Sequence, residues 1–343
     1  EMRESDWSSD VCSSDLVASD SLTNIEGIKG STTASNTLIG NNMNNTLIGG
    51  NQTDTIKGVS GNNSLSGGAG NDTIFAGTGS DTIDGGAGDD WLDYTDLAST
   101  NVSVNLRNNT ATYGSSTDSI TAIEHLKMGN GTNTVQGNSY ANSFIGGSST
   151  DTLSYSEAAS GVTVNVTSAG AGTSSGDGAD VFTGYENYTL SSNADTANLN
   201  VVHNGSIIDG GTGIDTASYA NVTTALTVTV NSGNTSAIVN YGTNSNKLKN
   251  IEKIIGGDGN DTFIVSNVAG INTLDGDGGT NTLQLSGSLD LSSVTLLNFN
   301  NILIANGDTL TLNAVDLTGK TMYITMSGTA NLVIVSDASS YDF

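Results

Sequence analysis

The chain has 343 residues with 44 Gly, no Pro, 5% aromatic and 13% charged residues, and a formal net charge of −26. This composition is typical of turns and short strands and excludes a thick globular core. Only nine Lys and Arg residues are present, which excludes an electrostatic nucleic-acid binder, because phosphate neutralisation needs clustered cations. No apolar run approaches the length of a membrane-spanning helix, so we expect no transmembrane segment.

The first segment, residues 1–16, resembles a translated sequencing adapter and is set aside from the fold. It contains Cys12, the only cysteine of the chain. The remaining sequence therefore cannot form disulfides, and metal ions are the staple left for a thin, glycine-rich fold. The adapter also predicts that the natural chain continues upstream, so we interpret the sequence as a fragment.

Residues 17–30 contain a closing signature in which an apolar residue precedes Glu, as Ile25-Glu26. The same signature returns after each of three alternating apolar strands further along the chain. These later pairs are Ile123-Glu124, Tyr185-Glu186 and Ile251-Glu252. Because residues 17–30 lack the opening strand, we predict that they are the tail of a truncated repeat unit.

Seven nine-residue repeats run without a gap through residues 31–93. Each repeat joins a polar turn to a short strand, and its eighth residue is apolar, as the narrow core of a solenoid requires. The eighth residues are Leu38, Leu47, Ile56, Leu65, Ile74, Ile83 and Leu92. The sixth residues are Asn36, Asn45, Asp54, Asn63, Asp72, Asp81 and Asp90. Residues 31–93 are therefore predicted to form a regular β-roll whose ligand charge rises toward its carboxyl end.

Residues 94–284 hold weaker nonapeptides within a longer period of about 61–66 residues, which predicts three degenerate β-solenoid units. Each unit contains an alternating apolar strand followed by a polar loop, the pattern of an inserted hairpin-like segment. These strands are Val102–Leu106, Val162–Val166 and Leu226–Val230. Residues 285–343 alternate apolar and polar side chains and are predicted to be a β-rich C-terminal segment.

The repeat Gly-Gly-x-Gly-x-Asp-x-apolar-x is complete at Gly67–Phe75 and again at Gly256–Ile264. It resembles the hemolysin-type calcium-binding repeats of the RTX family, which occur in secreted bacterial toxins, proteases, lipases and adhesins. The resemblance implies an all-β fold, namely a right-handed parallel β-roll or β-helix solenoid with inserted hairpin-like segments. It also implies that two nonapeptides form one coil and that calcium lies between turns eighteen residues apart.

Calcium takes six to eight oxygen ligands, and glycine turns expose backbone carbonyls that a side chain would block. With the implied spacing, two carboxylates face one site only at Asp54–Asp72 and at Asp72–Asp90. An Asn at the sixth position keeps an oxygen but lacks the charge, so the pair Asn45–Asn63 is expected to be held by amide hydrogen bonds instead.

The later turns give further candidate pairs, with ordinary solvated turn acids as the alternative. Asp195 is expected to share a site with Asp215, Asp261 with Asn281, and Asp151 is expected to face Asn133. The predicted metal-site residues are Asp54, Gly67, Gly68, Gly70, Asp72, Gly77, Gly79, Asp81, Gly85, Gly86, Gly88, Asp90, Asp151, Asp195, Asp215, Gly256, Gly257, Gly259 and Asp261.

No catalytic residue is predicted, and the chain is interpreted as not being an enzyme, with the activity of the parent protein left open. The segment Gly172–Gly176 fits the letters of a hydrolase elbow but lies in a Gly/Ser-rich loop without the strand-turn-helix context. The two histidines, His125 and His203, lack the spacing of a zinc protease.

We expect an extracellular calcium-binding module that folds when Ca²⁺ binds and forms a stalk or adhesin-like part of a larger secreted protein. The resemblance implies the type I secretion machinery as a partner, and cell-surface or matrix polysaccharide is a candidate target. One alternative is a calcium-dependent export and folding segment of a secreted enzyme or toxin. Another is a binder of ice or glycan through outward threonines. Those threonines are Thr37, Thr46, Thr55, Thr73 and Thr82.

Overall fold

The computed structural model describes residues 26–201, 204–231, 236–317 and 321–335. The adapter-like residues 1–16, most of the predicted truncated unit (residues 17–25) and His203 lie outside the described residues. Across the described part, the chain forms short β-strands and two 3-10 helices, Thr95–Leu97 and Ala314–Asp316. It divides into two compact units. The first ends at Ser154 and also includes Gly178–Tyr185; the second comprises Tyr155–Asp177 and the residues from Glu186 onward.

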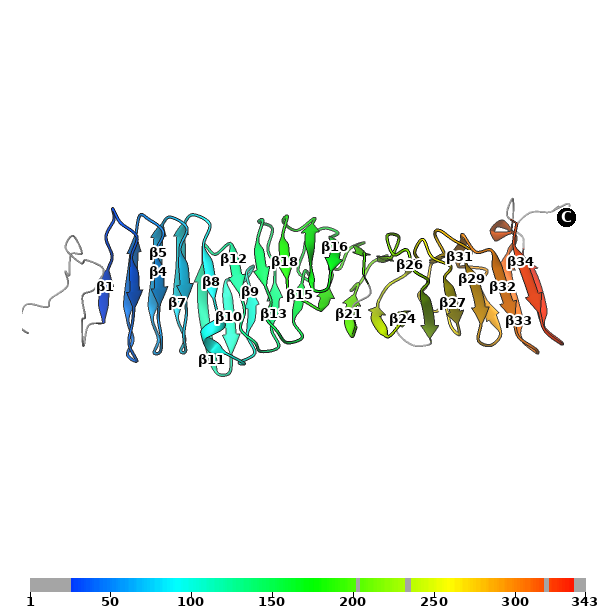
Figure 1. Ribbon diagram of the computed structural model, residues 1–343, viewed down its shortest axis with the longest axis horizontal. Helices are drawn as coiled ribbons and strands as arrows, with labels where there is room; N and C mark the ends of the chain where they lie inside the picture. Colours follow the sequence, from blue (N-terminus) through cyan, green and yellow to red (C-terminus); the bar gives the residue numbers. More distant parts are fainter. Residues whose placement is uncertain (1–25, 202–203, 232–235, 318–320, 336–343) are drawn as a thin grey trace, which may run out of the picture. The chain divides into compact units, whose positions relative to one another are not determined.

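The first unit contains two stacks of strands that run side by side along the repeat direction (Figure 1). Each stack is mostly parallel, and successive strands of one stack are eighteen residues apart in the regular block. The first stack, in pairing order, is β1 (Gly27–Lys29), β3 (Thr46–Gly50), β5 (Ser64–Ala69), β7 (Thr82–Ala87), β11 (Ser116–Thr121), β10 (Thr110–Tyr113), β9 (Ser103–Asn105), β13 (Thr134–Gln136) and β15 (Thr152–Ser154).

The second stack of this unit faces the first and takes the alternate nonapeptides. Its order is β2 (Thr37–Ile39), β4 (Thr55–Lys57), β6 (Thr73–Phe75), β8 (Trp91–Asp93), β12 (His125–Lys127), β14 (Ser143–Ile145) and β18 (Val181–Thr183). One coil therefore consists of two nonapeptides, one strand in each stack, and the parallel β-roll implied by the sequence is confirmed.

The apolar eighth residue of each nonapeptide fills the space between the two stacks. Leu47, Ile56, Leu65, Ile74, Ile83 and Leu92 are all at most 1% exposed. Their strand neighbours at the seventh and ninth positions are mostly exposed or half-buried, as alternation along a strand requires. Each buried aliphatic side chain contributes about 1.5–3 kcal/mol relative to an exposed one. The predicted core column is therefore confirmed.

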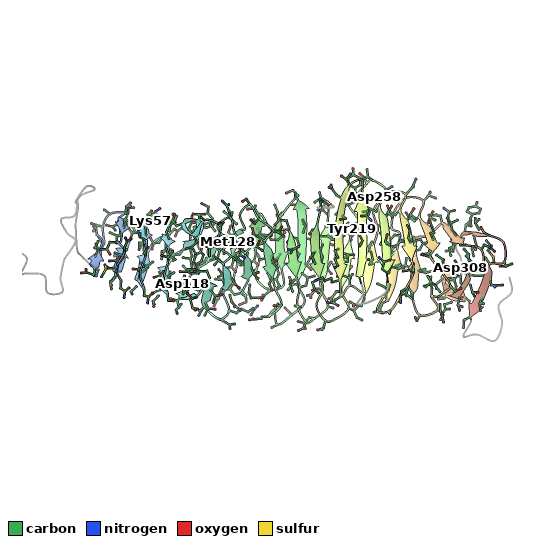
Figure 2. The ribbon with its side chains drawn as sticks, turned by 90° about the horizontal axis from the view of Figure 1, so that it is seen from below. Lys57, Asp118, Met128, Tyr219, Asp258 and Asp308 are labelled. Atoms are coloured by element: carbon green, nitrogen blue, oxygen red, sulfur yellow. The ribbon has the colours of Figure 1, made fainter. Side chains whose placement is uncertain are left out.

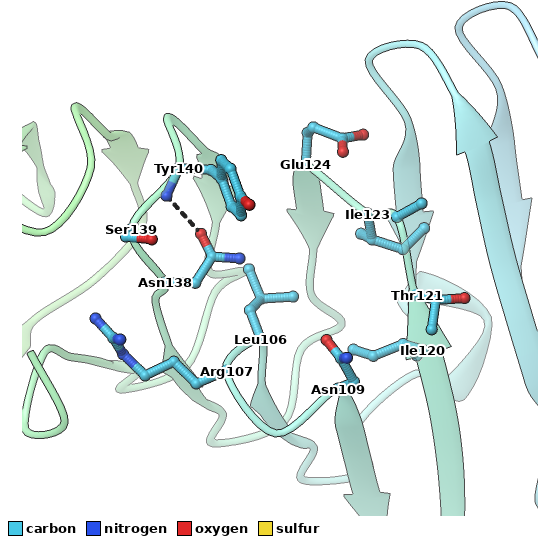
Figure 3. Close-up of a pocket in the computed structure, with 11 residues that line it drawn as sticks. Leu106, Arg107, Asn109, Ile120, Thr121, Ile123, Glu124, Asn138, Ser139 and Tyr140 are labelled. Atoms are coloured by element: carbon cyan, nitrogen blue, oxygen red, sulfur yellow. Dashed lines mark hydrogen bonds between the residues drawn. The ribbon is translucent and has the colours of Figure 1, made fainter.

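An inserted meander interrupts the first stack only. Between β7 and β13 the chain adds β11, β10 and β9, and β10 runs antiparallel to both of its neighbours. In the second stack, β8, β12 and β14 follow one another directly. The connections from β11 to β12 and from β13 to β14 consequently start three strands apart and end as neighbours, so they converge. A pocket of about 370 Å³ lies in this gap, with Glu124 and Tyr140 on facing sides (Figure 3).

The second unit repeats this plan with two stacks and an additional small sheet. Its first stack is β19 (Asn187–Thr189), β21 (Ser206–Asp209), β25 (Asn244–Lys249), β24 (Ser236–Tyr241), β23 (Thr227–Asn231), β27 (Thr262–Val265), β29 (Thr282–Leu285), β32 (Asn301–Ile304) and β34 (Tyr323–Met326). Here β25, β24 and β23 form a meander like that of the first unit.

The remaining strands of the second unit complete its coils. The second stack is β17 (Ala171–Ser175), β16 (Thr163–Ser168), β20 (Thr196–Leu199), β22 (Thr216–Ser218), β26 (Lys253–Ile255), β28 (Thr273–Asp275) and β31 (Thr295–Leu297). The small sheet is β30 (Leu289–Asp290), β33 (Thr309–Asn313) and β35 (Asn331–Val335). The β16–β17 and β23–β25 insertions are the hairpin-like segments expected from the alternating strands.

Candidate cation sites

A ladder of carboxylates links successive turns on one edge of the first unit. The backbone N–H of Asp54 donates to Oδ1 of Asp72 at 2.7 Å, and the N–H of Asp72 donates to Oδ1 of Asp90 at 2.7 Å. The N–H of Asn36 donates in the same way to Oδ1 of Asp54 at 2.6 Å. Each carboxylate therefore lies between two turns, and the eighteen-residue pairing predicted from the sequence is confirmed.

The second carboxylate oxygen of these residues has no hydrogen-bond donor. Oδ2 of Asp54, Asp72, Asp81, Asp90 and Asp215 is buried and without a partner. Burying an ionised carboxylate in this way is costly unless a proton or a cation accompanies it. The cost appears in the pKa values, since burial raises the pKa of Asp90 to about 6 and that of Asp215 to about 7, with neighbouring carboxylates adding to both.

Asn133 shows which oxygens converge on this position. Its side-chain amide nitrogen donates to the carbonyls of Gly129 at 3.0 Å, Gly131 at 2.8 Å and Gly146 at 3.3 Å. The first two carbonyls belong to its own turn, and the third begins the turn of Asp151. Asn281 does the same with the carbonyls of its own and the following turn. In these two Asn turns, an N–H group thus occupies a cage of carbonyl oxygens.

By the residue spacing seen at Asn133, the corresponding carbonyls in the turn of Asp72 are those of Gly68, Gly70 and Gly85. A Cβ added to Gly67 would overlap both the Gly85 carbonyl and Asp72 Oδ2, so only glycine leaves this space open. Positive φ angles of 108° at Gly68 and 114° at Gly70 shape the turn. Here a carboxylate oxygen replaces the amide of Asn133 and supplies no proton, so the cage contains only acceptors.

This donor set fits calcium. Calcium accepts carboxylate and carbonyl oxygens in flexible geometry, whereas zinc prefers four nitrogen or sulfur ligands. Among the described residues, no group of three or more His, Cys, Asp or Glu side chains comes together. The cation sites would therefore lie between the turns of Asp54, Asp72 and Asp90. Each would consist mainly of backbone carbonyls, with a carboxylate on two sides. The calcium bound there would supply the positive charge that the cage lacks.

The turn of Asp81 is filled differently. The hydroxyl of Tyr113, from β10 of the meander, lies 2.7 Å from the Gly79 carbonyl and 3.3 Å from the Gly77 carbonyl. These are the two cage carbonyls of this turn, at the positions that Gly129 and Gly131 take around Asn133. The same hydroxyl also lies 3.1 Å from Oδ1 of Asp118. Tyr113 therefore occupies a cage in which the sequence predicted a cation.

Asp118, labelled in Figure 2, is a ladder residue that the sequence reasoning missed. Its Oδ1 accepts the backbone N–H of Asp81 at 2.9 Å, and its Oδ2 accepts the Tyr94 hydroxyl at 2.9 Å. Burial raises the pKa of Asp118 to about 6 although both tyrosine hydroxyls lower it. The tetrapeptide Asp118–Thr121 reads as the last four residues of a nonapeptide, and this signal could have identified it.

The predicted site residues after Asp90 differ in whether both of their carboxylate oxygens accept hydrogen bonds. Asp195 lies beside Asp215, whose Oδ1 accepts the Asp195 N–H at 2.8 Å, and Oδ1 of Asp151 accepts the Asn133 N–H at 2.7 Å. Both oxygens of Asp195 already accept protein donors, which come from Val162 and Ser191.

Asp261 resembles Asp195 in this respect. Its Oδ1 accepts the Leu226 N–H at 2.7 Å, and its Oδ2 accepts the Gly257 N–H at 2.7 Å. Its neighbour Asn281 accepts the Asp261 N–H at 2.9 Å. Around Asp261 the glycines Gly256, Gly257 and Gly259 form the turn, and a Cβ at Gly256 would meet the carboxylate. Both oxygens of Asp195 and of Asp261 therefore accept hydrogen bonds from the protein. In Asp72, Asp90 and Asp215, Oδ2 accepts none.

The RTX calcium-binding nonapeptide repeat matches the chain in four copies, over residues 31–65, 57–92, 129–157 and 251–266. The matched stretches include the turns of Asp54, Asp72 and Asp90. No curated protein matches the chain. Among the described residues, no helix is long and apolar enough to span a membrane.

Proposed function

We propose that this chain, which carries RTX calcium-binding nonapeptide repeats, is a structural module of a secreted protein that folds when calcium binds. Repeats of this kind bind Ca²⁺, so the calcium-binding character of the module follows from the repeats themselves. The proposal rests on the contrast between the turn of Asn133 and the turn of Asp72, which share the same residue spacing. The amide of Asn133 fills its carbonyl cage, whereas the carboxylate of Asp72 leaves its cage without a donor.

Without a cation, the Asp turns bring acceptor oxygens together and bury them. Neighbouring strands in a stack are about 4.8 Å apart, so successive carboxylates repel one another strongly in a poorly solvated edge. Calcium that binds the folded turns and not the open chain stabilises folding by about 2.7 kcal/mol per site at one hundred times its dissociation constant. Millimolar extracellular calcium would then favour the folded module, and submicromolar cytosolic calcium would not.

The arrangement of the outward threonines gives little support to a flat surface that binds ice or glycan, and so favours a stalk or adhesin-like role. Thr37, Thr55 and Thr73 are aligned in the second stack of the first unit, but Trp91 takes the next place. In the first stack, Ser64 stands between Thr46 and Thr82. These columns are too short and mixed to present an ordered array, so they add little support for binding ice or glycan.

Far-ultraviolet circular dichroism of residues 17–343 during a calcium titration, with magnesium as the ionic control, tests the proposal. We expect a cooperative gain of β signal at sub-millimolar to millimolar calcium. Asp72→Ala should move the midpoint to higher calcium, whereas the matched control Asp290→Asn, which removes a charge from an exposed side chain, should not. A fully folded spectrum that chelator does not change would contradict calcium-driven folding.

A further inference from the structure

Short segments replace the glycine turn where a meander has been inserted, and two of them each lie within one unit. We call these two the closing segments: residues 122–124 connect β11 to β12, and residues 250–252 connect β25 to β26. Both contain a residue with positive φ, then Ile, then Glu. The positive φ is 49° at Ala122 and 49° at Asn250. Neither segment fits the nonapeptide pattern. Glu124 and Glu252 are therefore not among the residues that the pattern identifies as ligands.

The backbone of each closing segment supplies the carbonyl that completes the preceding cage. A Cβ added to Gly85 would overlap the Ala122 carbonyl, just as one added to Gly67 would overlap the Gly85 carbonyl. In the second unit, the Asn250 carbonyl stands in the same relation to Gly210. The left-handed conformation of Ala122 and Asn250 therefore directs an oxygen to the place that the first glycine of a regular turn would provide.

The glutamates take the place of the ladder carboxylate. Oε2 of Glu124 accepts the N–H of Asp90 at 2.9 Å, and Oε2 of Glu252 accepts the N–H of Asp215 at 2.9 Å. Asp90 and Asp215 are each 0% exposed, and Oδ2 of each has no hydrogen-bond partner. Two unrelated insertions thus end in the same arrangement, an unpartnered buried carboxylate facing a carbonyl and a second carboxylate.

The connection from β31 to β32, residues 298–300, follows no meander and provides an internal comparison. There the positive-φ residue is Asn298, and the final residue is Asn300, whose Oδ1 accepts the Asn281 N–H at 2.8 Å. The amide of Asn281 donates to the Asn298 carbonyl at 3.0 Å and so fills the cage. Where the preceding turn carries Asn, the closing residue is Asn; where it carries an unpartnered Asp, the closing residue is Glu.

We propose that the two closing segments complete two further calcium sites, one formed by Asp90, Glu124 and the Ala122 carbonyl, the other by Asp215, Glu252 and the Asn250 carbonyl. This inference rests on the proposed function, because it assigns additional ligands to the same kind of cage. The longer Glu side chain spans the distance left by a connection shorter than the glycine turn. Glu124 also lines the pocket between these converging connections (Figure 3), which gives a cation a route from solvent.

Terbium luminescence of the full-length chain tests the Glu124 site directly, because Tb³⁺ replaces calcium and emits when a nearby Trp transfers its excitation. Trp91 follows Asp90, and its ring lies 4.9 Å from that of His125, the residue after Glu124. We expect Glu124→Gln to weaken Tb³⁺ binding at this site by about tenfold or more and to reduce the emission sensitised by Trp91. Gln keeps an oxygen for the Asp90 N–H, so the fold is retained. Trp91→Phe identifies the emission that depends on Trp91.

Glu252→Gln is the matched variant for the second site. It should leave the emission sensitised by Trp91 unchanged and, in equilibrium dialysis with calcium, lower the number of ions bound per chain by one, as should Glu124→Gln. If both variants keep the wild-type number of ions while Asp72→Asn loses calcium, the closing-segment sites are refuted and the proposed function stands. If the wild-type chain binds no calcium, the proposed function fails and the inference with it.

Discussion

At the scale of the residue, the sixth position of each nonapeptide decides how its turn is held together. Asn133 and Asp72 differ by one group, yet the amide donates to three carbonyls and the carboxylate oxygen leaves its cage without a donor. Tyr113 provides a third solution, because its hydroxyl reaches the same two carbonyl positions from another strand. The same backbone cage is thus suited to an amide, a hydroxyl or a cation.

Asp72→Asn is predicted to stabilise the calcium-free chain and to reduce its response to calcium. The new amide would donate to the cage carbonyls as Asn133 does, which removes a desolvation penalty of about 1–3 kcal/mol. Urea unfolding with chelator and with saturating calcium measures both effects. Asp290→Asn, at an exposed position, is the charge-matched control and should change neither value. A variant that is less stable than wild type in chelator would show that the new amide does not donate to the cage carbonyls.

Tyr113→Phe is predicted to destabilise the chain in the presence of chelator. Removal of the hydroxyl leaves the half-buried carbonyl of Gly79 and the buried carboxylate of Asp118 without that donor, at a cost of about 1–3 kcal/mol. Tyr323→Phe, at an exposed position, is the control. The free energy of unfolding by urea is the measurement, and equal values for the two variants would refute a role of the Tyr113 hydroxyl in filling the cage.

At the scale of the element, the nine-residue period predicts the regular block well. Each repeat carries its own turn and strand, so the core column and the Asp54–Asp72–Asp90 ladder follow from counting residues. The ladder members after an insertion could not be found in this way. Asp118 follows Asp81 by 37 residues and Glu124 follows Asp90 by 34, because a meander intervenes in one stack only. Their place depends on which strands pair, and the period does not contain that information.

Gly67→Ala is predicted to destabilise the turn and to weaken calcium binding at Asp72. The added methyl group would overlap the Gly85 carbonyl and the Asp72 carboxylate, and overpacking of this kind costs about 1–3 kcal/mol. Gly27→Ala is the matched control, because a Cβ there meets no atom within 4 Å. Thermal unfolding at several calcium concentrations compares the two. Equal calcium dependence in both variants would show that the cage tolerates a side chain.

At the scale of the whole molecule, the stability of each unit is a sum over neighbouring coils. Every strand of a stack pairs only with the strands beside it, so each coil depends on its two neighbours and on the turns between them. The net charge of −26 opposes this stacking. Burial, with a further contribution from neighbouring carboxylates, raises the pKa values of Asp90, Asp118 and Asp215, so these three carboxyls resist ionisation in the folded chain.

The chelated chain is therefore predicted to lose stability as the pH rises. The pKa of each of these carboxyls is raised from 3.8 in the unfolded reference to about 6 or 7. Their protonated forms favour the folded state below pH 3.8, and this contribution is lost as the pH rises through 6 to 7. Calcium should counteract the loss at Asp90 and Asp215. Melting temperatures between pH 5 and pH 8, with and without chelator, measure it; a chelated chain that melts higher at pH 8 would contradict the prediction.

The amide of Asn133 fills the same kind of cage that a cation is proposed to fill in the Asp turns. This has a consequence for how the calcium response can evolve. The codons for Asn and Asp differ by a single base, so under the proposed function one point mutation converts a turn that fills its own cage into one that requires an ion. Such a change leaves the backbone, the core column and the strand register as they were. A lineage can therefore adjust the calcium concentration at which the solenoid assembles, one turn at a time, without passing through a misfolded ancestor.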